Sequence, residues 1–238
     1  MVYPRKEFPE IIKSGIIAKG RHGIVMPLLS HNLAEELRRQ PKSDAEIFEL
    51  GVGILRILWK LHDAGYVHAD LKPANVMIGF DGRLSLVDFG LSHKVLLKGG
   101  VEQSGDVEFF KGDPFFCSLA CARGMRATRH DDVESLLYVL AAALGVKLPW
   151  SKRSAVIDCK QLVKGYQVMQ YLPESLQAFH KVLDGAKQGS APDYERLLGV
   201  LKESAEKAHK LEHVSASEET KEEFIPKTPD KEPEIQAM

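Results

Sequence analysis

Hydrophobic residues near the start of the chain form two short runs separated by a polar turn. The runs extend over residues 15–18 and 23–29, and Lys19-Gly20-Arg21-His22 lies between them. Two apolar runs joined by a short polar turn that contains glycine are typical of a β-hairpin, because each run can pair with the other across the turn. We therefore expect two paired strands in this part of the chain.

The pattern then changes to the period of an α-helix. A short helix is expected over residues 33–39, and Ser43 followed by Glu46 is the pattern of a capping box at the start of a longer helix. The apolar positions after this box recur at helical spacing as far as Gly65: Ile47, Leu50, Ile54, Leu55, Leu58 and Leu61. This long helix leads into the polar segment that begins at Val67.

The middle and the end of the chain continue this alternation of strand and helix patterns. Short β-branched runs between residues 67 and 87 are broken by Gly79-Phe80-Asp81-Gly82, which predicts a small hairpin. Residues 131–144 begin with carboxylates, which favour the start of a helix, and continue with apolar residues on nearly every face, which predicts a buried helix. Shorter helical patterns follow over residues 154–170, 173–185 and 193–209.

The last part of the chain lacks a hydrophobic pattern. From Glu212 onward apolar residues are sparse, and Glu, Lys, Ser, Thr and Pro dominate. Such a composition cannot bury enough apolar surface to offset the entropy lost on ordering, so we expect residues 212–238 to form a disordered tail. Thr228-Pro229 is either a site for proline-directed phosphorylation or simply part of a solvated tail.

Two polar motifs lie within and directly after the second hairpin pattern. Asp70, Lys72 and Asn75 form one group, and Asp88-Phe89-Gly90 begins thirteen residues after Asn75. An Asp-x-x-x-x-Asn motif followed by Asp-Phe-Gly holds the groups that phosphoryl transfer needs. We predict that Asp70 accepts a substrate hydroxyl proton and that Lys72 offsets charge on the transferred group. Asn75 and Asp88 would hold Mg²⁺ against the phosphates of ATP. Each motif alone could be a structural turn, and the joint spacing favours the catalytic interpretation.

Composition and charge narrow the classes of protein that fit. The 238 residues are 44% hydrophobic, which is enough for one sizeable core or two small lobes. The formal net charge of −1 gives no overall electrostatic reason to bind nucleic acid or a membrane, and we expect neither as a partner. Cys117, Cys121 and Cys159 are odd in number and lack Cys-x-x-Cys spacing, so we expect free thiols and no zinc site.

Neither a signal peptide nor a membrane-spanning segment is evident from the sequence. The first seven residues lack an apolar core, and the apolar stretch from Ile47 to Leu61 is interrupted by Glu49, Arg56 and Lys60. We therefore expect an intracellular protein in the cytoplasm, the nucleus or both.

The polar motifs, with four further segments, resemble the protein kinase superfamily. The segments are similar to those of the casein kinase one group and its relatives, the vaccinia-related kinases: Gly112 to Ser118, Thr128 to Leu136, Leu148-Pro149-Trp150 and Ala191 to Tyr194. The resemblance covers roughly residues 8–205 and implies an α+β, protein kinase-like fold. In this interpretation residues 1–29 are a remnant of the small lobe and hinge, and residues 30–211 are the large lobe.

The resemblance also implies an adenine site. Met26 is similar to the gatekeeper, Leu28 and Leu29 to the hinge that faces adenine, and Met77 to part of the adenine floor. Met26 and Met77 are equally open to interpretation as ordinary core residues.

Further roles implied by the resemblance concern the surroundings of the catalytic loop. His68 and Phe89 would stack, and Asp132 would anchor the loop by accepting hydrogen bonds from its backbone. Residues 112–118 would form the floor for a peptide substrate. Arg129 would either hold an anionic group of a substrate or be a surface charge near Asp131. Cys117 and Cys121, near this floor, would be either redox-sensitive or simply small buried thiols.

The chain departs from the family pattern in two ways. Its sequence contains no glycine-rich phosphate loop, no Val-Ala-Ile-Lys strand and no preceding helix with a glutamate to pair with such a lysine. Ala69 stands where the family usually has an arginine that pairs with an anion on the activation segment. We therefore expect this segment to be ordered without phosphorylation acting through residue 69.

Two functions remain open on this basis. The first is a serine/threonine kinase that transfers the γ-phosphate of ATP to a protein substrate, and Lys72 argues against tyrosine specificity. The second is a catalytically impaired pseudokinase that binds another protein through the exposed hairpin and the peptide groove, because an isolated hairpin is only marginally stable in water.

Overall fold

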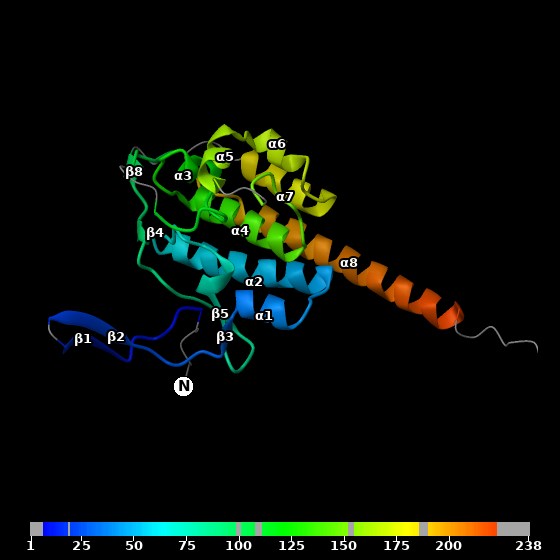
Figure 1. The fold of residues 1–238 in the computed structure, drawn as a ribbon, viewed down its shortest axis with the longest axis horizontal. Coiled ribbons are helices and arrows are strands. Elements are labelled where there is room, and N and C mark those ends of the chain that lie inside the picture. The colour runs from blue at the N-terminus through cyan, green and yellow to red at the C-terminus, as the bar shows by residue number, and fades with distance from the viewer. Residues whose placement is uncertain are drawn as a thin grey trace, which may run out of the picture.

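The computed structural model describes residues 7–18, 20–98, 101–107, 111–151, 155–185 and 190–222 (Figure 1). Its elements, in chain order, are β1 (Lys13–Ala18), β2 (Arg21–Val25), β3 (His31–Asn32), α1 (Leu33–Arg39), α2 (Asp44–Asp63), β4 (Tyr66–Val67), a 3₁₀ turn (Pro73–Asn75), β5 (Val76–Ile78), β6 (Leu84–Leu86), β7 (His93–Lys94), β8 (Leu97–Lys98), β9 (Val101–Glu102), α3 (Leu119–Ala122), α4 (Arg129–Ala143), α5 (Val156–Leu162), α6 (Gly165–Met169), α7 (Glu174–Asp184) and α8 (Tyr194–Glu222).

The helices α2, α4 and α8 form the centre of the molecule. α2 packs against both α4 and α8, and α7 covers α4 and α8 from the other side (Figure 1). The side chains between these helices are almost fully buried and apolar: Leu55, Leu58, Leu136, Leu140, Phe179, Leu197 and Leu201. Gly51 permits the close approach of α2 to α4, because a Cβ at this position would lie 3.0 Å from Leu140 Cδ1.

The capping box predicted for the long helix is confirmed. Ser43 Oγ accepts the backbone N–H of Glu46 at 3.3 Å, and Glu46 Oε2 accepts the backbone N–H of Ser43 at 2.9 Å. The buried helix is confirmed as well, although α4 begins at Arg129, two residues before the expected start. Thr128 and Asp131 cap it, since Asp131 Oδ2 accepts the Thr128 N–H at 2.7 Å.

Both predicted hairpins are present, although β2 ends at Val25 and residues 26–29 of the expected second run are not in a strand. β1 and β2 pair in antiparallel register and project away from the helical body (Figure 1). β5 and β6 form the second hairpin around the glycine-rich turn, and β3 extends it to three strands. This small sheet lies beside α1 and α2 and delivers residue 75 and residue 88 to the same end of the molecule. Lys19, in the turn of the first hairpin, lies outside the described residues.

Two expected elements differ from the structure. The helical pattern over residues 154–170 is divided into α5 and α6, because Val163 is extended between them and its carbonyl accepts a hydrogen bond from Arg123. α8 continues to Glu222, past residue 212, where we expected the disordered tail to begin. Alanine, glutamate and lysine are strong helix formers and prolong a helix whose first half is packed. Residues 223–238, including Thr228, lie outside the described part of the chain.

Within the described ranges, no helix combines the length and the hydropathy that crossing a membrane requires.

Candidate active site

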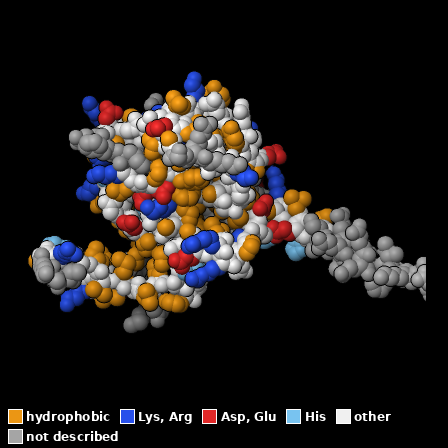
Figure 2. Space-filling model, in the orientation of Figure 1, with side chains coloured by type: hydrophobic (Ala, Val, Ile, Leu, Met, Phe, Trp, Pro, Cys, Tyr) orange, Lys and Arg blue, Asp and Glu red, His pale blue; other side chains and the backbone are white. Residues whose placement is uncertain are grey.

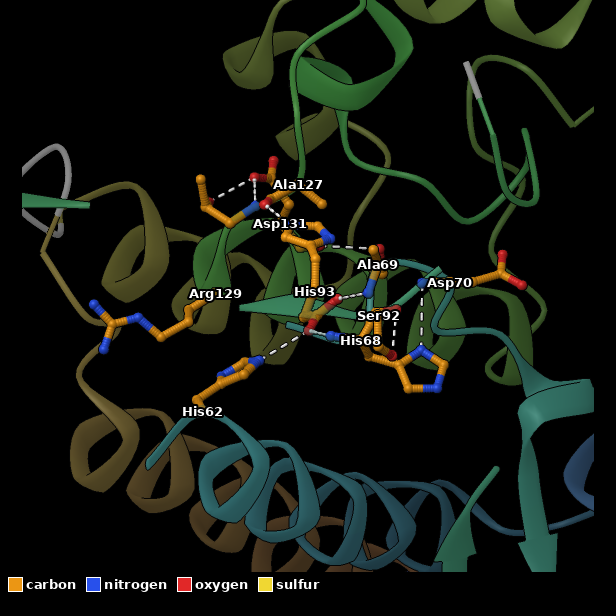
Figure 3. A network of polar contacts seen from close by, with 12 residues as sticks. His62, His68, Ala69, Asp70, Ser92, His93, Ala127, Arg129 and Asp131 are labelled. Atoms are coloured by element: carbon orange, nitrogen blue, oxygen red, sulfur yellow. Dashed lines mark hydrogen bonds and ion pairs between the residues drawn. The ribbon is translucent and has the colours of Figure 1, made fainter. Parts of the chain in front are cut away.

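The loop between β4 and the 3₁₀ turn is held from beneath by a carboxylate on α4. Asp132 accepts the backbone N–H groups of His68 at 2.7 Å and Ala69 at 2.8 Å (Figure 3). His62 Nε2 lies 2.9 Å from the same carboxylate, and His62 Nδ1 lies 2.6 Å from the hydroxyl of Tyr194. Burial disfavours the charged form of Asp132, but these hydrogen bonds outweigh it and hold its pKa below the usual value. The expected anchoring role of Asp132 is confirmed.

The backbone takes a left-handed conformation at two points of the site. The φ angles are 66° at Ala69 and 62° at Asp88, and no other non-glycine residue in the described part has a positive φ. This conformation costs a residue with a side chain on the order of 1 kcal/mol, so neighbouring contacts must stabilise it. Asp132 supplies that contact at Ala69. Before Asp88, Val87 is held on both sides, since its N–H donates to Asn75 O and its carbonyl lies 3.0 Å from His68 Nε2.

Asp70 lies within reach of three hydrogen-bond donors. Lys72 Nζ is 2.7 Å from Asp70 Oδ2, Asn75 Nδ2 is 3.1 Å from the same oxygen, and the Asp113 N–H is 2.9 Å from Asp70 Oδ1. The structure therefore brings together the acid, the lysine and the asparagine singled out in the sequence. The contact from Asp113 was missed, because its closeness to Asp70 depends on folding across more than forty positions.

Gly112 explains how the backbone of Asp113 can approach so closely. Its φ is +110°, and a Cβ there would lie 3.1 Å from Asp70 Oδ1. Any other residue would be strained and would press on the carboxylate of Asp70. Glycine at this position is thus part of the geometry of the site.

Lys72 is a half-buried cation directed at the acid. The hydrogen bond from its ammonium group to Asp70 raises the pKa of Lys72, and the negative charges of Asp113 and Asp88 add to this effect against partial burial. Lys72 is consequently charged at neutral pH, as stabilisation of a transferred phosphoryl group requires.

Asn75 and Asp88 provide the oxygens suited to a hard cation. Asn75 Nδ2 donates to the backbone and side-chain oxygens of Asp70, at 2.9 and 3.1 Å, which leaves Asn75 Oδ1 available as a ligand. Asp88 is exposed, and its Oδ1 accepts only a long 3.3 Å contact from the Gly90 N–H. An amide oxygen and a carboxylate match the preference of Mg²⁺, which retains several waters of its own. A cluster of three or more His, Cys, Asp or Glu side chains arranged for a metal does not occur among the described residues.

Phe89 continues this region with aromatic contacts. Its ring lies 5.3 Å from that of His68, edge to face, and 6.0 Å from that of Phe8. The expected contact between His68 and Phe89 is confirmed, but the rings meet edge to face and do not stack.

The residues expected around adenine are spread over an open surface. Leu28 is 84% exposed and Met26 is 43% exposed, whereas Met77 is half-buried on β5. A cavity of about 210 Å³ is lined by Leu28, Leu29 and Phe80, among others, but neither Met26 nor Met77 lines it. The described residues thus do not gather the four expected adenine contacts into one cavity.

A buried lysine that was not predicted from the sequence binds the backbone of the predicted peptide floor, residues 112–118. Lys160, on α5, is fully buried, and its Nζ donates to the carbonyls of Phe115 and Cys117, each at 2.6 Å. The ammonium group also lies over the rings of Tyr138 and Trp150, at 4.8 and 4.4 Å from their centroids. Burial lowers the pKa of Lys160 to about 8.

The two cysteines near this floor are half-buried free thiols. Burial raises the pKa of Cys117 to about 11, and it raises the pKa of Cys121 further. Because the thiolate is the reactive form, the raised pKa values disfavour reaction of both side chains at neutral pH. These values favour unreactive thiols over a redox-sensitive pair, although neither side chain is fully buried as expected.

Arg129 is neither a free surface charge nor paired with Asp131. Its Nε donates to Glu102 Oε2 at 2.8 Å, and both side chains are largely buried. Glu102 belongs to no periodic pattern or motif, because it lies between glycine-rich and polar stretches.

Comparison with known proteins shows the family to which the chain belongs. Residues 8–227 match the family model described as "Protein kinase domain". The chain belongs to the protein kinase domain family. Among its relatives is a probable casein kinase I homolog from Encephalitozoon cuniculi, 29% identical over 213 residues, or 82% of this chain and 66% of the relative. A probable serine/threonine-protein kinase from Dictyostelium discoideum is 31% identical over 75% of this chain and 39% of the relative.

A putative casein kinase I from Caenorhabditis elegans is 28% identical over 75% of this chain. The kinase-like fold and the relationship to casein kinase I expected from the sequence are thereby confirmed. The chain spans 66%, 39% and 57% of the lengths of these three curated relatives.

Proposed function

We propose that the chain carries the catalytic lobe of a serine/threonine protein kinase, which transfers the γ-phosphate of ATP to a hydroxyl of a protein substrate. The observation that supports this most directly is the convergence of Lys72, Asn75 and the Asp113 N–H on the carboxylate of Asp70. In this proposal residues 30–211 form the large lobe, and residues 1–29 form a remnant of the small lobe with the hinge.

Each group at the site has a distinct task in this reaction. Asp70 accepts the proton of the substrate hydroxyl and orients its oxygen toward the phosphorus atom. Lys72 lies beside Asp70 and offsets the negative charge that builds up on the transferred group.

Asn75 and Asp88 would hold Mg²⁺, which would neutralise negative charge on the phosphates of ATP. Asn75 is preorganised for this task by its two hydrogen bonds to Asp70. Asp88 is placed by Val87, whose backbone is bonded to Asn75 and His68. The adenine ring would rest against Leu28 and Leu29, which line one cavity beside the hinge, whereas Met26 and Met77 lie outside that cavity.

Thermal unfolding with and without Mg²⁺ and ATP tests the nucleotide site. Ligand at about 100 times Kd adds roughly 2.7 kcal/mol to the free energy of unfolding, which raises the melting temperature by several degrees. We expect this shift in the wild-type chain and not in Asp88→Asn. Asp158→Asn is the matched control, because Asp158 is an exposed acid on α5 that lines neither cavity. A folded wild-type sample with no shift would contradict the proposal.

Phosphoryl transfer itself is tested with Asp70→Asn. This variant keeps a similar shape at residue 70 but removes the proton acceptor, so we expect the shift with Mg²⁺ and ATP to persist and transfer to a serine-containing protein to fall at least 10²-fold. Equal transfer by wild type and variant would show that Asp70 is not the base.

A second candidate function is protein binding without catalysis, as in a pseudokinase. It is favoured by the apolar residues on the projecting hairpin, since Ile16 is 69% exposed and Ile24 is 57% exposed. Figure 2 shows hydrophobic side chains along the hairpin and on the adjoining surface of the body. If this is the function, complex formation with the protein partner survives Asp70→Asn and is lost on Ile24→Glu.

A further inference from the structure

A buried ion pair joins the segment after the Asp-Phe-Gly motif to the start of α4. Glu102 is the last residue of β9, and its side chain is 3% exposed. Its Oε2 lies 2.8 Å from Arg129 Nε, and its Oε1 accepts the backbone N–H of Arg129 at 3.1 Å. Arg129 is the first residue of α4, so the carboxylate pairs with a cation and also satisfies an N–H at the positive end of the helix.

Hydrogen bonds also join the backbone that follows Glu102 to the backbone that precedes Arg129. The Ser104 hydroxyl donates to Arg126 O at 2.7 Å, the Arg126 N–H donates to Gly105 O at 2.6 Å, and the Val107 N–H donates to Gly124 O at 2.8 Å. Residues 102–107 therefore run alongside residues 124–129. The hairpin of β8 and β9 has strands of only two residues each, and so short a hairpin is not stable by itself.

The catalytic loop contacts the earlier part of the segment, where the Ser92 hydroxyl donates to His68 O, but the side chain of Ala69 does not hold residues 102–107. Ala69, which precedes the acid, opens onto a cavity of about 340 Å³ that is also lined by Leu91, His93 and Met125. A methyl group cannot reach across that space to hold the segment. Glu102 and Arg129 are thus the ionic link between the segment and the helical body within the described residues.

The same end of α4 also holds the catalytic loop. Arg129, Asp131 and Asp132 belong to the first turn of α4, and Asp132 binds the backbone of His68 and Ala69 directly before Asp70 (Figure 3). The first turn of α4 therefore binds both Glu102, through Arg129, and the backbone of Ala69, through Asp132.

We propose that Glu102 and Arg129 form a built-in latch, a pair of positioning residues that keeps residues 102–107 docked beside the start of α4 without phosphorylation. The consequence for catalysis rests on the proposed function, because a docked segment keeps Gly112 and Asp113 beside Asp70. The docking itself does not depend on that function.

Hydrogen exchange of the full chain tests the latch directly. The informative amides are those of Val107 and Arg126, whose hydrogen bonds join the two stretches. We expect Glu102→Gln to increase their exchange at least tenfold while the amides of α2 stay protected. Glu35→Gln is the matched control, since it breaks an exposed Glu35–Arg39 pair with a 3.7 Å separation. It should change neither set of amides.

A segment that exchanges at the wild-type rate in Glu102→Gln overturns the latch. If Glu102→Gln also increases the exchange of the α2 amides, Arg129→Lys is the variant that tests the latch. It keeps the charge and the backbone N–H but loses the guanidinium geometry, so faster exchange confined to residues 102–107 and 124–126 supports the latch, and unchanged exchange overturns it.

Catalysis is measured in the same samples. If wild type transfers phosphate, Glu102→Gln should lower kcat with little change in KM for ATP; an unchanged kcat overturns the positioning role. If wild type transfers none, the proposed function fails, and the exchange data still decide whether the segment is latched.

Discussion

At the scale of single residues, the site depends on backbone positions as much as on charged side chains. Asp70 and Lys72 carry the charges, but Gly112 allows the Asp113 N–H to reach Asp70, and Ala69 and Asp88 hold strained conformations on either side. A sequence motif identifies the charged groups because their types are diagnostic. It does not identify Gly112 as a contact of Asp70, because that closeness arises only when residues far apart in the chain meet.

Replacement of Gly112 should therefore cost more than an ordinary loop substitution. Gly112→Ala places a Cβ 3.1 Å from Asp70 Oδ1 at a φ of +110°, and we expect it to lower the free energy of unfolding by roughly 1–3 kcal/mol. Gly105→Ala is the control, because Gly105 has open space around it and no positive φ. Urea denaturation measures both, and equal effects of the two substitutions would show that Gly112 carries no special constraint.

At the scale of elements, the correct predictions concern features formed by residues close together in the sequence. The capping box at α2 and the glycine-rich turn between β5 and β6 are complete within a few residues, so their patterns sufficed. Glu102, Lys160 and His62 were missed because their partners lie 27, 45 and 70 residues away. The division between α5 and α6 was missed for the same reason, since Arg123 stabilises it from outside that pattern.

The burial of Lys160 on α5 predicts that the free energy of unfolding depends on pH. The pKa of Lys160 is about 8 in the folded chain and about 10.4 when unfolded, so between these values the unfolded chain binds more protons. The contribution of Lys160 to the free energy of unfolding therefore rises with pH above about 8. From pH 7.5 to 9.5, wild type should gain roughly 1–2 kcal/mol relative to Lys160→Met.

Urea denaturation at several pH values checks this difference. The cysteines are present in both proteins, so their ionisation in the unfolded chain cancels in the comparison. A wild-type curve parallel to that of Lys160→Met would mean that the pKa of Lys160 is not depressed. Lys160→Arg provides a control for the loss of charge, since arginine stays protonated throughout this range.

At the scale of the whole molecule, the helical body and the projecting hairpin differ in how far they bury their apolar side chains. The body buries a continuous apolar core, whereas β1 and β2 expose isoleucines and pair with no other strand in the described part of the chain. The sequence predicted the two strands correctly because strand propensity is local. It did not predict how far the hairpin stands from the body, because exposure depends on what else packs nearby.

This difference predicts contrasting effects of substitution on stability. Ile16→Glu removes little buried area, so we expect it to change the free energy of unfolding by less than about 0.5 kcal/mol. Leu136→Ala, in the core at 0% exposure, should cost about 2–5 kcal/mol. Urea denaturation of both variants measures the contrast. A loss of 2 kcal/mol or more in Ile16→Glu would place the hairpin against the body in solution. A negligible loss would leave its apolar side chains free for contact with another protein, as the second candidate function requires.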